Sequence, residues 1–332
     1  MPTSRLPKLP SLLERKLYKT GQTRGADDDV IYQNRVSRNS TVLIPYACWD
    51  MCAVWQHFEA YENGFIVLLT PPEYFGNPNI NADLTAKGLA IGTNTVVFYE
   101  TREQWIANNP DALNWTAAER RKAPLGGQYV ARIPATTAAK NAGRIVRGFN
   151  VTAMKGAGIR EYEYASAETI KRCRLQLETL FWLCNDSDNV AVVNGMTAEA
   201  AATRKLAILG NCRELGLLDI ARLTEVRILN VQEKTICPLC REELSGQGFF
   251  NRMEQAEGRV VPDLTVTQLN LFHIAELRIS ALNHRPYNLG WGHHHCNVVV
   301  KDSGIRKTLE WMREVLRRNI EEGHFTLENS AI

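Results

Sequence analysis

The sequence predicts a mixed α/β (α+β) protein with three regions: an N-terminal region built on a mixed sheet, a helical middle, and a C-terminal module organised by metal ligands. Short β-branched and aromatic runs separated by turn residues indicate the sheet, and apolar residues three and four positions apart indicate the helices. Cysteine and histidine residues gathered near the end of the chain indicate the metal ligands. We expect the three regions to cover residues 1–160, 161–232 and 233–332.

The N-terminal region contains four apolar runs that are rich in β-branched or aromatic residues, as buried strands are. These runs are Thr41–Ile44, Phe65–Leu69, Thr95–Tyr99 and Tyr129–Ile133. The expected helices are Leu12–Tyr18, Trp49–Tyr61, Arg102–Asn108 and Trp115–Lys122, the last with Asn114 as its N-cap. Together these elements predict a mixed α/β region.

The middle of the chain has the periodicity of helices. Its apolar residues on one helix face are Ile170, Cys173, Leu177, Leu180, Phe181 and Cys184. Thr197 is an expected N-cap for a helix that runs to about Gly210, and a second short helix is expected over Asn211–Leu217. Two short helices joined at a glycine resemble a helix-turn-helix, but packing in a core explains such a pattern more often.

The chain closes with an expected amphipathic helix. Its apolar positions are Ile305, Leu309, Met312, Leu316 and Ile320, and Asp302 or Ser303 is the expected cap. This helix is expected to pack on the C-terminal module or on a second subunit. Since no stretch approaches the roughly 20 apolar residues that span a bilayer, and the N-terminus lacks the apolar run of a signal peptide, we expect a cytoplasmic protein without a membrane segment.

The net charge of +3 is too small to indicate a nucleic-acid partner by itself. Basic residues nevertheless gather between positions 140 and 174, where few acidic residues offset them. The candidates for contacts with an anionic partner are Lys140, Arg144, Arg147, Lys155 and Arg160. A solvated surface is the other explanation of the same stretch.

Two pairs of residues near the C-terminus have the spacing of zinc ligands. Cys237 and Cys240 form a CxxC pair, and His293 and Cys296 repeat the two-residue gap with a histidine in first place. Four such side chains match a tetrahedral Cys3His zinc site, which is usually structural because it leaves no position for water or substrate. Zinc can stabilise a small module by roughly 10 kcal/mol or more. His294 or His295 could replace His293, but the spacing favours His293.

Three further residues within and beside the zinc pairs are His273, Asn288 and Asn297, which lie fifteen and nine residues apart. Because these residues occur in this order together with the zinc knuckle, the segment from about Ile236 to Ser303 resembles the HNH (ββα-metal) nuclease superfamily. The resemblance implies that His273 is the general base and that Asn288 orients it through its loop. It also implies that Asn297, at the start of a helix, supplies an oxygen ligand to Mg²⁺.

The sequence departs from the family pattern at one position. The family usually has an aspartate or histidine directly before the base, as the main metal ligand, and here that residue is Phe272. Glu276 could supply the missing carboxylate, and the other nearby candidates are His295, His284 and Asp302. Alternatively His273 itself binds the metal and a different residue is the base.

The resemblance implies a Mg²⁺-dependent deoxyribonuclease that also binds structural Zn²⁺. The sequence shows neither the DNA-binding repeats of homing nucleases nor the translocation domains of secreted toxins, which favours a Type II restriction endonuclease of the bacterial or archaeal cytoplasm. Such an enzyme would cut double-stranded DNA as a homodimer, with residues 1–160 reading the sequence. The alternatives are a homing or non-specific HNH nuclease, and a degenerate zinc-containing protein that binds DNA without cutting it.

Overall fold

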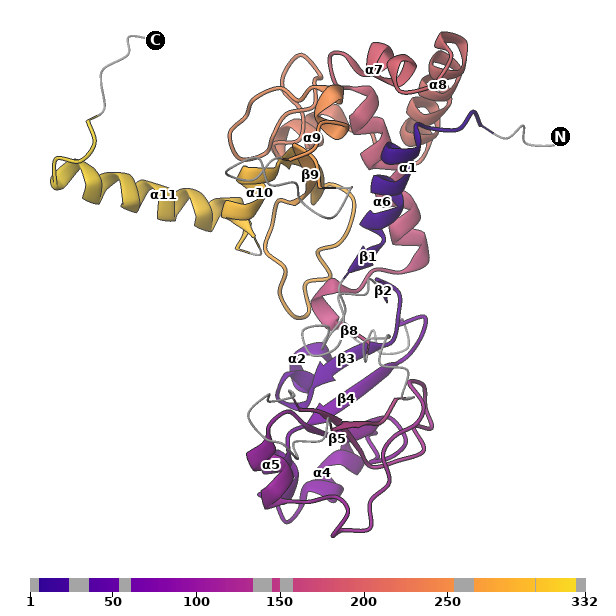
Figure 1. Cartoon of the computed structure of the whole chain (residues 1–332), viewed down its shortest axis with the longest axis vertical. Coiled ribbons are helices and arrows are strands. Elements are labelled where there is room, and N and C mark those ends of the chain that lie inside the picture. The colour runs from indigo at the N-terminus through magenta and orange to yellow at the C-terminus, as the bar shows by residue number, and fades with distance from the viewer. Residues whose placement is uncertain are drawn as a thin grey trace. The chain divides into compact units, whose positions relative to one another are not determined.

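The computed structural model of the chain describes residues 6–23, 36–53, 61–133, 145–149, 158–253, 266–301 and 303–326 (Figure 1). The chain forms two compact units. Unit 1 consists of Met1–Thr20, Lys171–Leu277 and Asn283–Ile332, and unit 2 consists of Gly21–Ile170 and Arg278–Leu282. The predicted helical region and the C-terminal module thus lie mostly in one unit, and a short piece of that module belongs to the other.

Unit 2 is built on a sheet with the strand order β7-β6-β5-β4-β3-β8. The neighbours β3, β4, β5 and β6 are parallel, β8 is parallel to β3 on its other side, and β7 is antiparallel to β6. Their bounds are Val42–Pro45 for β3, Phe65–Leu69 for β4, Thr95–Tyr99 for β5, Tyr129–Arg132 for β6, Val146–Arg147 for β7 and Ile159–Arg160 for β8. The four predicted strands are confirmed; β7 and β8 are too short to be recognised from periodicity.

Short helices follow the strands of unit 2, and two of them begin at well-formed caps. They are α2 (Trp49–Ala53), α3 (Pro71–Phe75), α4 (Ile80–Ala86) and α5 (Arg102–Ala107), and two short strands, β1 (Gln22–Thr23) and β2 (Val36–Ser37), pair apart from the main sheet. Thr70 and Thr101 each accept a hydrogen bond from the backbone three residues on, with Glu73 and Gln104 completing the capping boxes. The predicted helix from Trp49 is confirmed for its first turn, and residues 54–60 lie outside the described part of the chain.

The predicted helix Trp115–Lys122 is wrong. Asn114 has a φ of 54°, which is the left-handed region and not the conformation of an N-cap. The backbone N–H of Ala118 donates to the carbonyl of Tyr129 at 2.8 Å, so the segment pairs with the start of β6. Since its backbone groups bond to a strand, they are not available for the i to i−4 bonds of a helix.

Helices α1 (Ser11–Thr20), α6 (Ala167–Trp182), α7 (Ser187–Val193), α8 (Ala198–Glu214) and α9 (Ile220–Glu225) make up most of the remaining helical structure. All six residues of the predicted apolar face on α6 and just after it are buried. Thr197 accepts a hydrogen bond from the backbone of Ala200 at 3.1 Å, which confirms it as the N-cap of α8. The predicted break at Gly210 is wrong: α8 continues to Glu214 because Cys212 is fully buried on the same helix.

The C-terminal part of unit 1 is a β-hairpin followed by two helices. Strand β9 (Leu269–His273) pairs antiparallel with β10 (Leu289–His293), in a register that sets His273 opposite Leu289. Helix α10 (His294–Val300) follows β10 directly and packs against both strands. Phe272, Leu289 and Trp291 are buried in the core of unit 1 together with Cys237 and Cys296.

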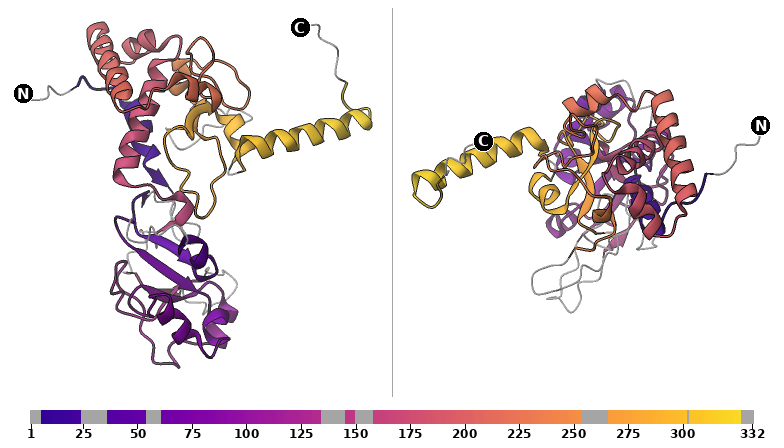
Figure 2. Two further views of the ribbon diagram at one scale, coloured as in Figure 1. Left: turned by 180° about the vertical axis from the view of Figure 1, so that it is seen from behind. Right: turned by 90° about the horizontal axis from the view of Figure 1, so that it is seen from above.

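The predicted closing helix is confirmed as α11 (Gly304–Glu321), with Ser303 at its N-cap and Asp302 outside the described residues. Only its first turn is buried, at Gly304, Ile305 and Thr308. In both views of Figure 2, α11 (yellow) extends away from the rest of unit 1. In the described ranges, no helix has both the length and the apolar character that a bilayer-spanning segment requires.

Candidate functional site: a Cys/His cluster beside the β9–β10 hairpin

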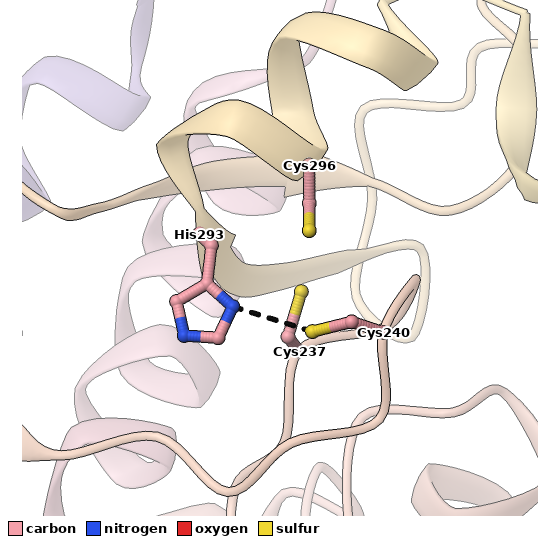
Figure 3. A group of neighbouring side chains, drawn as sticks. All are labelled: Cys237, Cys240, His293 and Cys296. Atoms are coloured by element: carbon pink, nitrogen blue, oxygen red, sulfur yellow. Dashed lines mark hydrogen bonds between the residues drawn. The ribbon is translucent and has the colours of Figure 1, made fainter.

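Four side chains from two parts of unit 1 converge on one point (Figure 3). Cys237 and Cys240 lie on a turn, His293 ends β10, and Cys296 lies in the first turn of α10. Their ligand atoms are all within 4.8 Å of one another, so that the group can hold a metal ion. Three thiols and one imidazole are the donors of a tetrahedral Cys3His site.

Backbone hydrogen bonds hold the turn that carries the two cysteines. The N–H of Cys237 donates to the carbonyl of Glu242 at 2.8 Å, and the N–H of Arg241 donates back to the carbonyl of Cys237 at 2.9 Å. Arg241 takes a φ of 70°, which bends the chain tightly. The guanidinium of Arg227 donates to the carbonyl of Pro238 at 2.9 Å and fixes the turn from outside. The two thiols are therefore oriented before any ion binds.

Burial sets the protonation of the cluster. Cys237 and Cys296 are buried, Cys240 is exposed, and His293 is half-buried. Burial raises the pKa of Cys240, and the neighbouring thiol of Cys237 raises it further. Burial also raises the pKa of Cys296, as do both other thiols, and burial lowers the pKa of His293. Near neutral pH the thiols of Cys240 and Cys296 therefore keep their protons and the imidazole is neutral. A cation would displace the thiol protons, since thiolate is the ligand form.

The two histidines after His293 make contacts with groups other than the cysteines. The Nδ1 atom of His294 is 3.1 Å from the side-chain nitrogen of Asn270. His295 is exposed, and its ring stacks on that of His293 with 5.4 Å between centroids and 7° between planes. The Nδ1 atom of His293 is 3.3 Å from the sulfur of Cys240, so His293 is the histidine that the structure brings to the cysteines.

His273 ends β9 and is half-buried. Its Nε2 atom is 3.1 Å from Nδ1 of His284, whose side chain is only 1% exposed. Sequence reasoning named His284 as a candidate metal ligand and did not foresee this pairing, because the two residues are eleven positions apart along irregular chain. The two imidazoles form a pair in which one ring nitrogen donates and the other accepts.

Asn288 binds the chain on both sides of the loop that joins β9 to β10. Its side-chain oxygen accepts from the N–H of Ala275 at 2.7 Å, and its side-chain nitrogen donates to the carbonyl of Asn283 at 2.7 Å. Its own carbonyl accepts from the N–H of Ile274 at 3.0 Å. Asn288 therefore fixes the two residues that follow His273.

Phe272 stands where HNH nucleases usually have a metal ligand, and the side chains of Phe272 and Glu276 contact other parts of unit 1. Phe272 is fully buried, and a Cβ on Gly292 would lie 2.5 Å from its ring, so the strand needs a glycine to accommodate this phenylalanine. The carboxylate of Glu276 pairs with Lys307 of α11. Asn297 lies half-buried on α10, one residue after Cys296. Within the described ranges, the Cys/His cluster is the one group of three or more Cys, His, Asp or Glu ligand atoms so closely placed.

Two of the five predicted basic contacts lie on described strands of unit 2. Arg147 on β7 pairs with Asp111, donates to the hydroxyl of Tyr129 at 3.3 Å, and lies 4.9 Å from the ring centre of Trp105. Arg160 on β8 is 43% exposed and 3.9 Å from the nearest carboxylate. Lys140, Arg144 and Lys155 lie outside the described residues.

A sequence model described as "BstXI restriction endonuclease" matches residues 15–294. One solved structure, described as "Crystal structure of a type II restriction endonuclease", aligns with a TM-score of 0.26 and 16% identity. The alignment covers 47% of this chain and only 57% of that chain. No curated protein matches the sequence. Since the family model covers most of the sequence, the chain belongs to the BstXI restriction endonuclease family.

Proposed function

We propose that the chain is a Type II restriction endonuclease that hydrolyses double-stranded DNA at an HNH-type centre formed by β9, β10 and α10. The observation that carries this proposal is the hairpin-and-helix order, with a histidine at the end of the first strand and a Cys/His cluster at the junction of the second strand and the helix. Membership of a restriction endonuclease family supports the same activity.

In this proposal the cluster holds Zn²⁺ for a structural purpose. Cys237, Cys240, His293 and Cys296 fit zinc in kind and number, and four protein ligands leave no position for substrate. When bound by these four residues, an ion would join the cysteine turn to the end of β10 and the start of α10. It would thereby fix the hairpin that carries His273 without touching the substrate.

The chemistry assigned to the protein's own groups is a proton transfer. His273, which is more exposed than His284, accepts a proton from the attacking water, while the water oxygen forms a bond to phosphorus and the bond to the leaving oxygen breaks. His284 holds the ring of His273 from its buried side, and Asn288 holds the backbone behind it. Base, orienting partner and rigid loop are the parts that general-base catalysis needs.

That Asn297 and Glu276 bind Mg²⁺ stays a prediction. Mg²⁺ takes oxygen ligands, whereas Phe272 offers none and the carboxylate of Glu276 pairs with Lys307. The neighbour of His273 is another imidazole. Two nitrogens bound at about 2.0–2.1 Å to one ion lie roughly 3 Å apart, so a second candidate is a transition-metal ion shared by His273 and His284.

We propose that unit 2 reads the DNA and that a second copy of the chain docks along α11. Exposed apolar side chains recur on this helix, with Leu309 38%, Leu316 43% and Ile320 38% exposed. Arg306 near its N-terminus and Glu322 after its C-terminus oppose the helix dipole, and an antiparallel copy would bring these opposite charges together. A two-fold dimer places one centre on each strand of a palindromic site.

Incubation of the full chain with plasmid DNA tests the activity. Parallel reactions contain Mg²⁺, Mn²⁺, Ni²⁺ or EDTA. Discrete fragments support the restriction endonuclease, and fragments with Mn²⁺ or Ni²⁺ but not Mg²⁺ support the shared-imidazole site. A smear supports a non-specific nuclease, and retarded but intact plasmid supports a protein that binds without cutting; each of these two results would overturn the proposal.

A further inference from the structure

Unit 2 contains a pocket of about 390 Å³ at the end of its sheet where the parallel strands finish. The carboxyl ends of four parallel strands, β3, β4, β5 and β8, contribute to its walls. The chain moves from β3 through β4 and β5 in one direction, whereas β8 joins β3 on the opposite side. In parallel sheets, ligands bind at this edge and at such a reversal of strand order.

The lining of the pocket is mainly apolar, with a few polar groups among the apolar ones. Phe98 and Tyr162 are aromatic residues of the lining, and Glu100 and Arg160 are two of its charged residues. Glu161 is only 3% exposed. An apolar pocket of this size with few polar groups is typical of small-molecule sites.

The buried carboxylate of Glu161 is firmly held. One oxygen accepts from the backbone N–H of Ser280 at 2.8 Å, and the other accepts from the hydroxyl of Tyr61 at 3.3 Å. Within the described residues, the carboxylate of Glu100 accepts no hydrogen bond and stays available to a ligand. Glu73 is bound by the backbone and hydroxyl of Thr70.

Charge restricts what the pocket can hold. Three carboxylates, of Glu73, Glu100 and Glu161, face one guanidinium, that of Arg160, which disfavours a phosphate group. From the last residue of β3 the chain reads Pro45-Tyr46-Ala47-Cys48, without the glycines that let a backbone approach a phosphate. Among the described residues the three carboxylates do not form a metal-binding group.

We propose that this pocket binds a single unpaired nucleobase that carries an exocyclic amino group, cytosine or adenine. The carboxylate of Glu100 accepts the amino hydrogens, which is how acidic side chains read cytosine, and the aromatic side chains contact the face of the base. The base comes either from a free nucleoside or from a nucleotide turned out of a DNA duplex. The inference concerns unit 2 and does not depend on the nuclease chemistry proposed for unit 1.

NMR titration of the full chain with cytidine, adenosine, uridine and thymidine tests the proposal. Cytidine or adenosine should bind about tenfold more tightly than uridine and thymidine, because only the first two present an amino group to Glu100. Addition of a 5′-phosphate should weaken binding. Equal affinity for all four nucleosides, or binding of none together with no response to DNA in the experiment below, overturns the proposal.

Two matched pairs of variants locate the site. Ala47→Trp narrows the pocket from an exposed position and should abolish binding, whereas Ala107→Trp on α5, also exposed, should not. Glu100→Ala should remove the preference for amino-bearing bases, whereas Glu103→Ala, which is outside the pocket, should keep it. If Ala47→Trp fails to fold, as judged by its melting curve, the comparison of Glu100→Ala with Glu103→Ala tests the site instead. Unchanged selectivity for the four nucleosides in Glu100→Ala overturns the assignment.

Duplex DNA distinguishes the two sources of the base. Oligonucleotides that carry the cleavage sequence, with 2-aminopurine replacing each adenine in turn or pyrrolo-cytosine each cytosine, should brighten at one position when a base leaves the stack. If the fluorescence rises and Ala47→Trp removes the rise, the pocket binds a base from DNA. If nucleosides bind but the fluorescence does not rise, the pocket binds a free nucleoside. Both results support the pocket. A protein that does not cut DNA still allows the nucleoside titration, so failure of the nuclease proposal is separable from failure of this one.

Discussion

The Cys/His cluster of unit 1 and the pocket of unit 2 are held in place by different means. The cluster joins a turn, the end of one strand and one helical turn, and its geometry depends on a few backbone hydrogen bonds and on the shared ligand point. The pocket is formed by the ends of four strands, and most side chains of these strands are buried. We therefore expect the first region to depend on its ion for stability and the second to keep its shape when empty.

The largest effect is expected from loss of the metal ion proposed for the cluster. Cys296→Ser should release the metal and unfold the hairpin and α10, since zinc can contribute roughly 10 kcal/mol to such a module. Cys48→Ser in unit 2 is the matched control and should keep the metal. Elemental analysis and melting curves of both variants measure the effect, and a Cys296→Ser protein that retains one metal per chain would contradict it.

The next effect concerns the helical core beside the cluster, which contains a buried ion pair. The guanidinium of Arg204 binds both oxygens of Glu178 at 2.6 and 2.9 Å, and the side chain of Glu178 is only 7% exposed. Arg204→Ala leaves this carboxylate without its cation and should cost about 3–5 kcal/mol. Urea unfolding measures the loss, with Lys205→Ala in an exposed pair as the control. An equal loss of unfolding free energy in the two variants would mean that burial of Glu178 does not increase what its ion pair contributes to stability.

A smaller effect is expected from the partner of the proposed base. His284→Ala should slow cleavage about 10- to 100-fold, as removal of an orienting group does, while leaving the melting temperature of unit 2 unchanged. DNA binding separates this role from simple packing, because loss of an orienting group should slow the reaction while DNA binding is retained. An unchanged cleavage rate would remove His284 from the site.

The smallest effect is expected at α11. Leu316→Glu introduces a charge into the proposed contact between two copies and should weaken self-association about tenfold. Leu206→Glu on α8, which is 72% exposed, provides the control. Sedimentation velocity over a range of concentrations measures both variants. A wild-type chain that is monomeric throughout, or a Leu316→Glu chain that associates as strongly as the wild type, would contradict docking along α11.

The sequence predicted best what depends on local spacing. The four long strands of the sheet, the N-cap at Thr197 and the two spaced pairs Cys237/Cys240 and His293/Cys296 follow from patterns a few residues long. The structure forms these elements and brings the four Cys and His side chains together. The helix expected after Asn114 failed because a non-local strand, β6, takes its backbone hydrogen bonds. The break expected at Gly210 failed because burial of a neighbouring residue outweighs the low helix propensity of glycine.

What escaped prediction depends on contacts between distant parts of the chain. Nothing in the spacing of His273 and His284 indicates that their rings meet, and nothing near Glu276 indicates that Lys307, on another helix, takes its carboxylate. The pocket of unit 2 could not be foreseen because its polar residues are separated in sequence and meet only when parallel strands align. Such sites become visible only once the sheet order is known.

The cleavage rate of His273→Ala on a plasmid substrate tests the central claim most directly. His324→Ala, an exposed histidine after α11, serves as the matched control, and DNA binding by both variants is measured alongside. We predict a loss of about 10²- to 10⁴-fold for His273→Ala, with DNA binding retained and the control unaffected. Cutting by His273→Ala at the rate of the control would contradict the proposed centre.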